Sequence, residues 1–335
     1  LLVKLQLLLA KVFGLKKPMS KEGIIELLLM SQKAQKTGLN FTNQMSNYSI
    51  ETLKESIINA KDYDQVISKI PRERIVEEWK KWATKGKYHS KIFDFLRKSG
   101  LGAKLYPELM ELKNTQQDIV YHPEGDVEEH TKQVIAKMNE IISNLDLTTD
   151  QKELLMYAAL FHDIAKPETT QKEYSEKLGR IRITAKGHEA AGEAKSIDLL
   201  NRMGIKKEIQ EQVGKLIAEH LAHINISTLP MTENKLSKQK KSAFAKLVKR
   251  LNPANVEQLM LLMEADMLGR NNAGADTPAS IIEFANLLEQ YKTENKGSLD
   301  FKPILLGRHL IKSGLKPGPE FKDILKTAEL AQLNL

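Results

Sequence analysis

The sequence predicts an all-α, multi-helical protein. Apolar residues recur with the helical period of about 3.6 along most of the 335-residue chain, and alternating strand patterns are nearly absent. Hydrophobic residues make up 41% of the chain, charged residues 28% and aromatic residues only 6%, which is typical of a soluble helical protein. The exception is the stretch GRIRITAKG at 179–187, which we expect to form a small β-hairpin arm.

The first predicted helix covers the apolar opening LLVKLQLLLAKVFGL. It is only 15 residues long and is interrupted by Lys4 and Lys11, so it is too short to span a bilayer. No small-residue cleavage site follows it, which argues against a secretory signal. We therefore expect an amphipathic or buried helix here, and no membrane partner.

Two helices further along the chain are predicted from their capping signals. Asp126 precedes an amphipathic stretch with Glu129 three residues later, and Thr148 precedes another with Gln151, so each pair predicts a capping box. The polar and basic stretch TENKLSKQKK at 232–241 is instead expected to be a solvated connector loop.

Four predicted helices each direct a histidine or an aspartate towards a common interior. His130 lies on the apolar stripe of the helix that follows residue 126, and His162 and Asp163 lie near the C-terminal end of the next helix. His220 and Asp266 are each in helical register with apolar residues of their own segments. The four helices are therefore expected to bring these side chains together.

The histidines are concentrated in one part of the chain. Taken singly, each is most simply a core residue satisfied by its neighbours. Together, the pattern His130, His162-Asp163 and Asp266 predicts a metal site, because imidazole nitrogen combined with carboxylate oxygen suits Mn, Fe, Ni, Co or Zn, whereas carboxylates alone suit Mg or Ca. Adjacent helical residues project at about 100° to one another, so His162 and Asp163 can occupy neighbouring corners of one coordination sphere. Six of the eight histidines fall within 102 residues, at positions 122, 130, 162, 188, 220 and 223.

The composition limits both the compartment and the partners. The chain contains no cysteine, which excludes disulfides and thiolate metal ligands and fits a reducing, cytoplasmic compartment. The net charge of +8, from 51 Lys and Arg against 43 Asp and Glu, favours a polyanionic partner such as nucleic acid. A lysine-rich surface in a compositionally biased genome explains this charge equally well.

Several phrases of the sequence resemble the HD superfamily of metal-dependent phosphohydrolases, whose signature is H…HD…D. The closest resemblance is to the neck, body and HD regions of bacterial tRNA nucleotidyltransferases, the CCA-adding enzymes. The phrases that carry it are YHPEGDVEEHT, AALFHDIAKPETT, GHEAAG and ADMLGR, with IPRERIVEEWKK and LYPEL upstream and KPILLGRHLIKSGLKPGPEFKDIL downstream. The resemblance covers residues 18–335.

This resemblance implies a division of the chain into regions. An N-terminal helix or a remnant of the head domain would occupy residues 1–17, an elongated helical neck 18–110, the HD-domain helical bundle 111–270 and a helical tail 271–335. It also implies one or two divalent ions, Mn, Ni, Co, Fe or Mg, and no organic cofactor.

The resemblance also implies roles for individual residues. The metal ligands would be His130, His162, Asp163 and Asp266, while His188 and His220 would complete a second metal site or hold substrate phosphate. His223 competes with His220, since both fit the helical spacing. Asp163 and Lys166 would act in catalysis, and the substrate would contact Lys166, Arg270 and His122, although both cations are also ordinary surface charges.

The signals of a working polymerase head are missing from the chain. No Gly-Ser turn introduces a pair of carboxylates, and the only DxD motif, Asp62-Tyr63-Asp64, follows no glycine turn. The segment EGIIELLLMSQKAQKTGLNF at 22–41 corresponds to the family's junction phrase, but Glu26 and Leu29 stand where arginines would contact the incoming nucleotide. A glutamate there would repel a triphosphate, so nucleotidyltransferase activity is not expected of this chain.

Three functions follow from these observations. The leading hypothesis is a metal-dependent phosphohydrolase or phosphodiesterase that acts on nucleotide or RNA phosphate esters such as 2′,3′-cyclic phosphates. The second is a tRNA-binding module that has lost its chemistry, and the third is a fragment of a CCA-adding enzyme that lacks its head. The basic strip expected to bind RNA in the second hypothesis comprises Lys235, Lys238, Lys240, Lys241, Lys246, Lys249 and Arg250.

Overall fold

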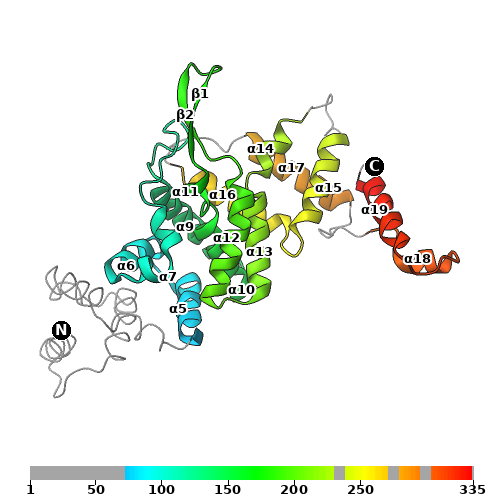
Figure 1. Ribbon diagram of the computed structural model, residues 1–335, viewed down its shortest axis with the longest axis horizontal. Coiled ribbons are helices and arrows are strands. Elements are labelled where there is room, and N and C mark those ends of the chain that lie inside the picture. The colour runs from blue at the N-terminus through cyan, green and yellow to red at the C-terminus, as the bar shows by residue number, and fades with distance from the viewer. Residues whose placement is uncertain (1–71, 230–237, 271–278, 295–302, 334–335) are drawn as a thin grey trace, which may run out of the picture.

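The computed structural model describes residues 72–229, 238–270, 279–294 and 303–333 (Figure 1). Within these ranges the regular secondary structure is helical apart from one two-stranded hairpin, which confirms the all-α prediction. The predicted helix at 1–17, the junction segment at 22–41 and the motif Asp62-Tyr63-Asp64 lie outside the described residues. The domain boundaries remain predictions.

Short helices precede the main bundle and pack against it through aromatic side chains. Trp82 stacks on Tyr157 of α10 (Thr149–Phe161) with ring centroids 6.3 Å apart, and Trp79 Nε1 donates a 2.9 Å hydrogen bond to the Tyr106 hydroxyl. Both tryptophans are buried, so these helices share one hydrophobic core with the bundle. They are α5 (Arg72–Lys85), η1 (His89–Lys91), α6 (Ile92–Ser99), α7 (Leu101–Leu105) and α8 (Pro107–Glu111).

Helix α10 is the centre of the bundle. Every residue from Glu153 to Phe161 is buried, so this helix has no solvent-facing side. It packs against α5 and three further helices, and another helix packs on α13. These are α9 (Val127–Ser143), α13 (Lys207–Glu219) and α16 (Val256–Leu268) around α10, with α12 (His188–Met203) on α13.

The helix starts are defined by their capping residues. Thr148 and Gln151 form the predicted capping box at α10. At α9 the side chain of Asp126 accepts a 3.0 Å hydrogen bond from the backbone N–H of Glu129, which is the first half of the predicted box. A capping box that was not predicted, Asn255 with Gln258, begins α16. Local polar chemistry therefore sets where the bundle helices begin.

The β-hairpin lies further upstream than its sequence signal indicated. It pairs β1 (Gln171–Ser175) with β2 (Arg180–Thr184) in antiparallel register, so only the second strand falls within the predicted stretch 179–187. The first strand, QKEYS, contains a single aromatic residue and no apolar alternation, which explains why the pattern missed it. The hairpin projects from the body of the molecule (Figure 1). Both terminal nitrogens of Arg180 donate to the carboxylate of Asp118 at 2.9 Å, which ties the hairpin to the segment that precedes α9.

The C-terminal part of the chain is also helical. The prediction of a connector loop at 232–241 is wrong at its C-terminal end, because residues 238–241 already belong to a helix. In this helix Lys240 is buried and pairs with Glu283. In the part of the chain that the structure describes, no helix combines the length and the apolar character needed to cross a bilayer. The remaining helices are α11 (Lys166–Thr169), α14 (Ala222–Ser227), α15 (Lys238–Leu251), α17 (Ala279–Glu294), α18 (Gly307–Lys312) and α19 (Glu320–Leu333).

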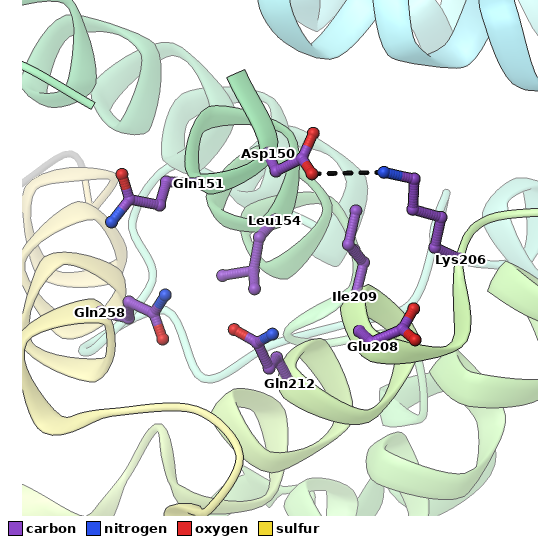
Figure 2. Close-up of a pocket in the computed structure, with 8 residues that line it drawn as sticks. All are labelled: Asp150, Gln151, Leu154, Lys206, Glu208, Ile209, Gln212 and Gln258. Atoms are coloured by element: carbon purple, nitrogen blue, oxygen red, sulfur yellow. Dashed lines mark hydrogen bonds and ion pairs between the residues drawn. The ribbon is translucent and has the colours of Figure 1, made fainter. Parts of the chain in front are cut away.

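A cavity of about 270 Å³ lies between the start of α10 and helices α13 and α16 (Figure 2). Lys206 spans its rim and pairs with Asp150 at 3.3 Å. The cavity is at the opposite end of α10 from His162 and shares no lining residue with the predicted metal ligands. Its lining consists of Asp150, Gln151, Leu154, Lys206, Glu208, Ile209, Gln212 and Gln258.

Candidate metal centre

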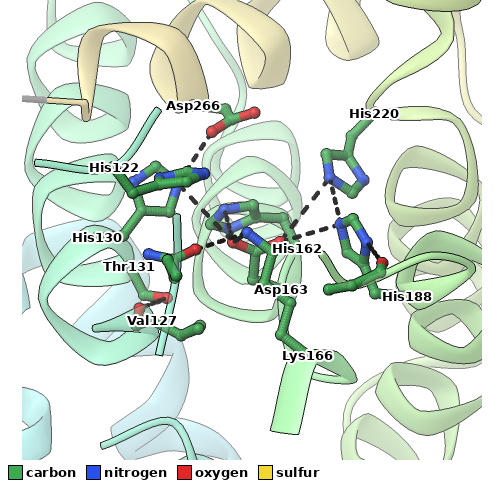
Figure 3. Close-up of polar contacts among 12 residues, drawn as sticks. His122, Val127, His130, Thr131, His162, Asp163, Lys166, His188, His220 and Asp266 are labelled. Carbon is green, nitrogen blue, oxygen red and sulfur yellow. Dashed lines mark hydrogen bonds and ion pairs between the residues drawn. The ribbon is translucent and has the colours of Figure 1, made fainter. Parts of the chain in front are cut away.

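The predicted metal-binding side chains come together in the interior of the bundle (Figure 3). Three of the histidines lie at helix ends: His162 directly follows α10, His188 begins α12 and His220 directly follows α13. The other two ligand candidates lie within helices, His130 in α9 and Asp266 in α16. Five elements far apart in the sequence therefore contribute to one buried cluster.

The three helix-end histidines have the same orientation. In His162, His188 and His220, Nδ1 lies 3.0, 2.6 and 2.7 Å respectively from the backbone carbonyl oxygen three residues earlier. A carbonyl only accepts hydrogen bonds, so Nδ1 must carry the proton. The lone pair of each ring is then on Nε2, which faces the cluster, as in histidines that ligate metals.

Asp163 lies at the middle of the cluster. Its Oδ1 is 3.2 Å from Nε2 of His188 and 4.0 Å from Nε2 of His220. Its Oδ2 is 3.2 Å from Nε2 of His162 and 3.8 Å from Nε2 of His130. The two oxygens of one carboxylate therefore face two different groups of histidines.

The second carboxylate of the cluster pairs with His130. Nε2 of His130 is 3.0 Å from Oδ1 of Asp266, and the other oxygen of Asp266 accepts a 3.2 Å hydrogen bond from Arg270. His130 and Asp266 come from α9 and α16, which pack against each other. The pairing therefore depends on the bundle having formed.

Three buried polar atoms of the cluster have no hydrogen-bond partner, namely Nε2 of His162, Oδ2 of Asp163 and Nδ1 of His130, although Oδ2 of Asp163 forms an ion pair with Lys166. Nε2 of His162 and Oδ2 of Asp163 are only 3.2 Å apart, yet they are not aligned for a hydrogen bond. Atoms that bind one cation at about 2.1 Å lie roughly 3.0 Å apart in octahedral and roughly 3.4 Å apart in tetrahedral geometry. The spacing of these two atoms, and the 3.3 Å between Nε2 of His188 and His220, fits shared coordination.

The ligand atoms form two overlapping groups of three that share Asp163. One contains His130 and His162, and the other contains His188 and His220; within each group the ligand atoms lie within 4.8 Å of one another. The donor set is imidazole nitrogen and carboxylate oxygen, which suits a divalent transition metal. The cluster therefore fits one or two divalent ions.

The two carboxyl groups of the cluster are held ionised. Burial alone would raise the pKa of Asp163, but the electrostatic effects of His162 and Lys166 outweigh it and hold the pKa well below its usual range. The pKa of Asp266 is likewise well below its usual range, since Arg270 and His130 outweigh its burial. Both side chains are therefore available as anionic ligands.

The imidazoles respond to burial in two ways. Burial, reinforced by the charge of His188, lowers the pKa of His220 to about 3, so that His220 is neutral at ordinary pH. Burial also acts on His188 and His130, but hydrogen bonds to Asp163 and Asp266 respectively outweigh it and raise their pKa values. His188 and His130 therefore favour their protonated, positively charged form beside the carboxylates. A bound cation would replace that positive charge.

The three residues predicted to contact substrate lie beside the cluster. Lys166 Nζ is 2.7 Å from Oδ2 of Asp163, and Arg270 pairs with Asp266 as described. His122 packs edge-on against His130 with ring centroids 4.7 Å apart. Of the two competing histidines, the structure brings His220 into the cluster, whereas His223 is buried outside both groups.

Two further residues at the cluster were not predicted. The carboxylate of Glu124 lies 2.8 Å from Nδ1 of His122, and the side-chain oxygen of Gln117 accepts a 2.7 Å hydrogen bond from Lys166. Both belong to the irregular segment before α9, where no periodic pattern indicates which way a side chain points. The only available signal was position, because Glu124 lies between His122 and His130 in the phrase YHPEGDVEEHT.

Comparison with known proteins identifies the class of this bundle. Residues 127–257 match the family model of the HD domain. The chain therefore contains an HD domain, and its predicted ligands His130, His162, Asp163, His188 and His220 lie within the matched range, whereas Asp266 lies beyond it.

Multifunctional CCA proteins are among the relatives that match part of this chain. The chain is 29% identical over 220 residues to the multifunctional CCA protein of Nitrosococcus oceani. This match covers 65% of this chain and 47% of the relative. The chain is 30% identical over 200 residues to that of Mannheimia succiniciproducens, covering 59% and 43% of the two chains. The match to that of Pasteurella multocida is 28% over 182 residues, covering 53% and 38%. The chain is thus similar over part of its length to multifunctional CCA proteins, as the sequence phrases predicted, and the matches span less than half of each relative.

Proposed function

We propose that this chain is a divalent-metal-dependent phosphohydrolase that acts on nucleotide or RNA phosphate esters, such as 2′,3′-cyclic phosphates. The observation that carries the proposal is the buried Nε2 of His162, which has no hydrogen-bond partner although it lies 3.2 Å from the anionic Oδ2 of Asp163, in a cluster of imidazoles and carboxylates. Ordinary packing does not favour an imidazole nitrogen without a partner, because it costs free energy to bury. A bound cation removes this cost.

The residues around the cluster suit a phosphate ester. A divalent cation held there supplies a Lewis acid for a phosphoryl oxygen and lowers the pKa of water. The ammonium group of Lys166 has three N–H donors, and its contacts with Asp163 and Gln117 use two of them. The third can donate to a phosphate oxygen, while the positively charged guanidinium of Arg270 stabilises the negative charge that develops on the phosphoryl group.

The similarity to multifunctional CCA proteins and this charge arrangement support the proposed substrate class. Hydrolysis of a cyclic phosphate adds water to phosphorus and breaks the bond to one ribose oxygen, which leaves with a proton. Asp163 is placed to orient the attacking water, because its two oxygens face both histidine groups. We therefore assign Asp163 and Lys166 to catalysis.

The test is hydrolysis of 2′,3′-cyclic AMP by the chain supplied with Mn, Ni or Co, compared with the variants His162→Ala and Asp163→Ala. We expect each variant to lose more than about 100-fold in turnover, since even residues that only support a metal ligand are worth 10–100-fold. Asp198→Asn, an exposed carboxylate on α12, is the control and should keep full activity. Equal turnover in all four proteins would remove the phosphohydrolase assignment.

The similarity to multifunctional CCA proteins also favours a second candidate, an RNA-binding part of a CCA-adding enzyme. The predicted basic strip gives it little support, because Lys241 pairs with Glu294 at 2.6 Å and Lys249 pairs with Glu329. Lys240 is buried rather than exposed, and Lys235 lies outside the described residues. Titration of tRNA affinity against salt separates this candidate from hydrolysis, because binding to the RNA backbone weakens steeply as salt rises.

A further inference from the structure

His130 differs from the other metal-binding histidines in its position on its helix. His162 and His220 reach carbonyl groups in the last turns of their helices, and His188 reaches the carbonyl of Ala185 in the loop before α12. His130 lies inside α9, where each carbonyl already accepts an intrahelical bond; the carbonyl of Val127, three residues earlier, also accepts the hydroxyl of Thr131 at 2.7 Å. The Nδ1 atom of His130 therefore needs an acceptor from outside its own helix.

Glu124 supplies that acceptor. Its Oε1 is 2.8 Å from Nδ1 of His130, and the same oxygen is 2.8 Å from Nδ1 of His122, with which it forms a hydrogen bond. The Glu124 side chain is 0% exposed, so water does not compete for this carboxylate. The contact with His130 is at hydrogen-bond distance but is not aligned, as is common for active-site bonds that tighten only when the site is loaded.

The segment that carries Glu124 is fixed to the start of α9. The backbone N–H of Asn114 donates to the carboxylate of Asp126 at 2.9 Å, and the backbone N–H of Val127 donates to the carbonyl of Thr115 at 3.1 Å. Its turn before α9 passes through Gly125, whose φ of 123° disfavours any residue with a Cβ. These two bonds, with the hydrogen bond from the N–H of Gly125 to the carbonyl of His122 at 3.3 Å, hold the segment that places Glu124 beside His130.

We propose that Glu124 is a positioning residue for His130. Its carboxylate keeps the proton on Nδ1, orients the ring and leaves the Nε2 lone pair for the cation, which is the task that backbone carbonyls perform for the other three histidines. A full negative charge makes His130 a more basic ligand than a carbonyl would. Glu124 lies outside the range that matches the HD-domain model, so this support comes from the segment that precedes the domain.

The alternative use of Glu124 is as a ligand itself. The atoms of His122, Glu124 and His130 lie close enough together to hold a cation of their own. A neutral imidazole has one lone pair, so a cation on Nδ1 of His130 would leave Nε2 protonated and unable to bind the central cation. The two arrangements therefore predict different numbers of ions and different tautomers of His130.

The test is calorimetric titration of the metal-free chain with Mn²⁺, alone and as the variants Glu124→Gln and Glu124→Ala. Glutamine keeps the acceptor and loses only the charge, so we expect about a 10-fold weaker affinity; alanine loses both, so we expect up to about 100-fold. The number of ions should not change in either variant. Glu129→Gln is the control, because this carboxylate lies in the first turn of α9, next to His130 in the sequence, and is 47% exposed. Long-range ¹H–¹⁵N spectra of the chain loaded with diamagnetic Zn²⁺ should show His130 protonated on Nδ1 in the wild type and a mixture of tautomers in Glu124→Ala.

Two results would overturn this inference. One is an affinity for Mn²⁺ that stays at the wild-type value in both Glu124 variants. The other is the loss of one whole equivalent of Mn²⁺ in Glu124→Ala and His122→Ala alike, which would make the carboxylate a ligand. The inference rests on the proposed function only for the presence of a cation, so a wild-type chain that binds no divalent metal overturns both. A chain that binds metal but hydrolyses no phosphate ester overturns only the proposed function.

Discussion

Replacing Asp163 with asparagine tests the metal centre through folding stability rather than through turnover. Asp163 faces both groups of histidines, and asparagine keeps its size while it removes the anionic ligand from each. A ligand that binds only the folded chain stabilises it by about 2.7 kcal/mol at 100 times its Kd. We therefore expect Mn²⁺ at that concentration to raise the unfolding free energy of the wild type by this amount, and that of Asp163→Asn by much less.

The substitution also acts without metal. Lys166 Nζ is 2.7 Å from Oδ2 of Asp163, and both side chains are largely buried, at 11% and 2% exposure. Breaking a buried pair by removing one charge costs about 3–5 kcal/mol. Because the ammonium keeps Gln117 and the amide oxygen as acceptors, we expect the lower end, about 3 kcal/mol, for metal-free Asp163→Asn.

Urea unfolding with and without Mn²⁺ measures both effects, and a Tm shift of roughly 5 °C is the thermal equivalent of the metal effect. Asp198→Asn is the matched control, since this carboxylate is 69% exposed and pairs only with Arg202 on its own helix. An Asp163→Asn variant that gains as much stability from Mn²⁺ as the wild type would refute the placement of Asp163 at the metal centre.

Three further predictions concern neighbouring contacts. Lys166→Gln should lower turnover of a cyclic phosphate by about 100-fold, the usual value of one donor to the transition state, while the Mn²⁺ affinity measured by calorimetry stays within about threefold; equal losses of both would contradict a substrate role. The hydrogen bond from Arg180 lowers the pKa of Asp118, so the pair stabilises the fold above the unfolded carboxyl pKa of about 3.9 and loses this effect as pH falls through the lowered folded value. Arg180→Gln should therefore lower the midpoint of urea unfolding at pH 7 and lower it less in acid, measured by urea titration at both pH values; a shift that is independent of pH would contradict this. Trp82→Ala should lower the unfolding free energy by about 3–5 kcal/mol, because the ring is buried against Tyr157 and its Nε1 donates to the carbonyl of His89; a loss below 1 kcal/mol would contradict the shared core.

The helices and their starts were predictable because their signals are local. The box of Thr148 with Gln151 needs only four consecutive residues, and the inward direction of His130 follows from the helical period. The first strand of the hairpin was not predictable in this way. Its residues are mostly polar and exposed, and its pairing with β2 depends on a neighbour across the turn rather than on its own pattern.

The residues of the candidate site also differ in how far the sequence could predict their direction. Side chains on helices, such as His162 and Asp266, have a direction that the period determines, and the structure brings them to one interior. Glu124 and Gln117 lie in a segment without regular structure, where direction is set by contacts with distant residues such as Lys166. The prediction that Lys240 belongs to an RNA-binding basic strip rested on charge alone. Lys240 does belong to a basic stretch of sequence, but its side chain is buried against Glu283.

The burial of α10 from Glu153 to Phe161 links the packing of the core to the geometry of the site. His162 and Asp163 follow directly after this helix, so a displacement of α10 by a fraction of an ångström carries both ligands with it. Substitutions on its faces, at residues that never touch a metal or a substrate, should therefore impair cation binding while the chain is still folded. Substitutions around α10 should therefore reduce the affinity for the cation before they reduce the thermal stability of the chain.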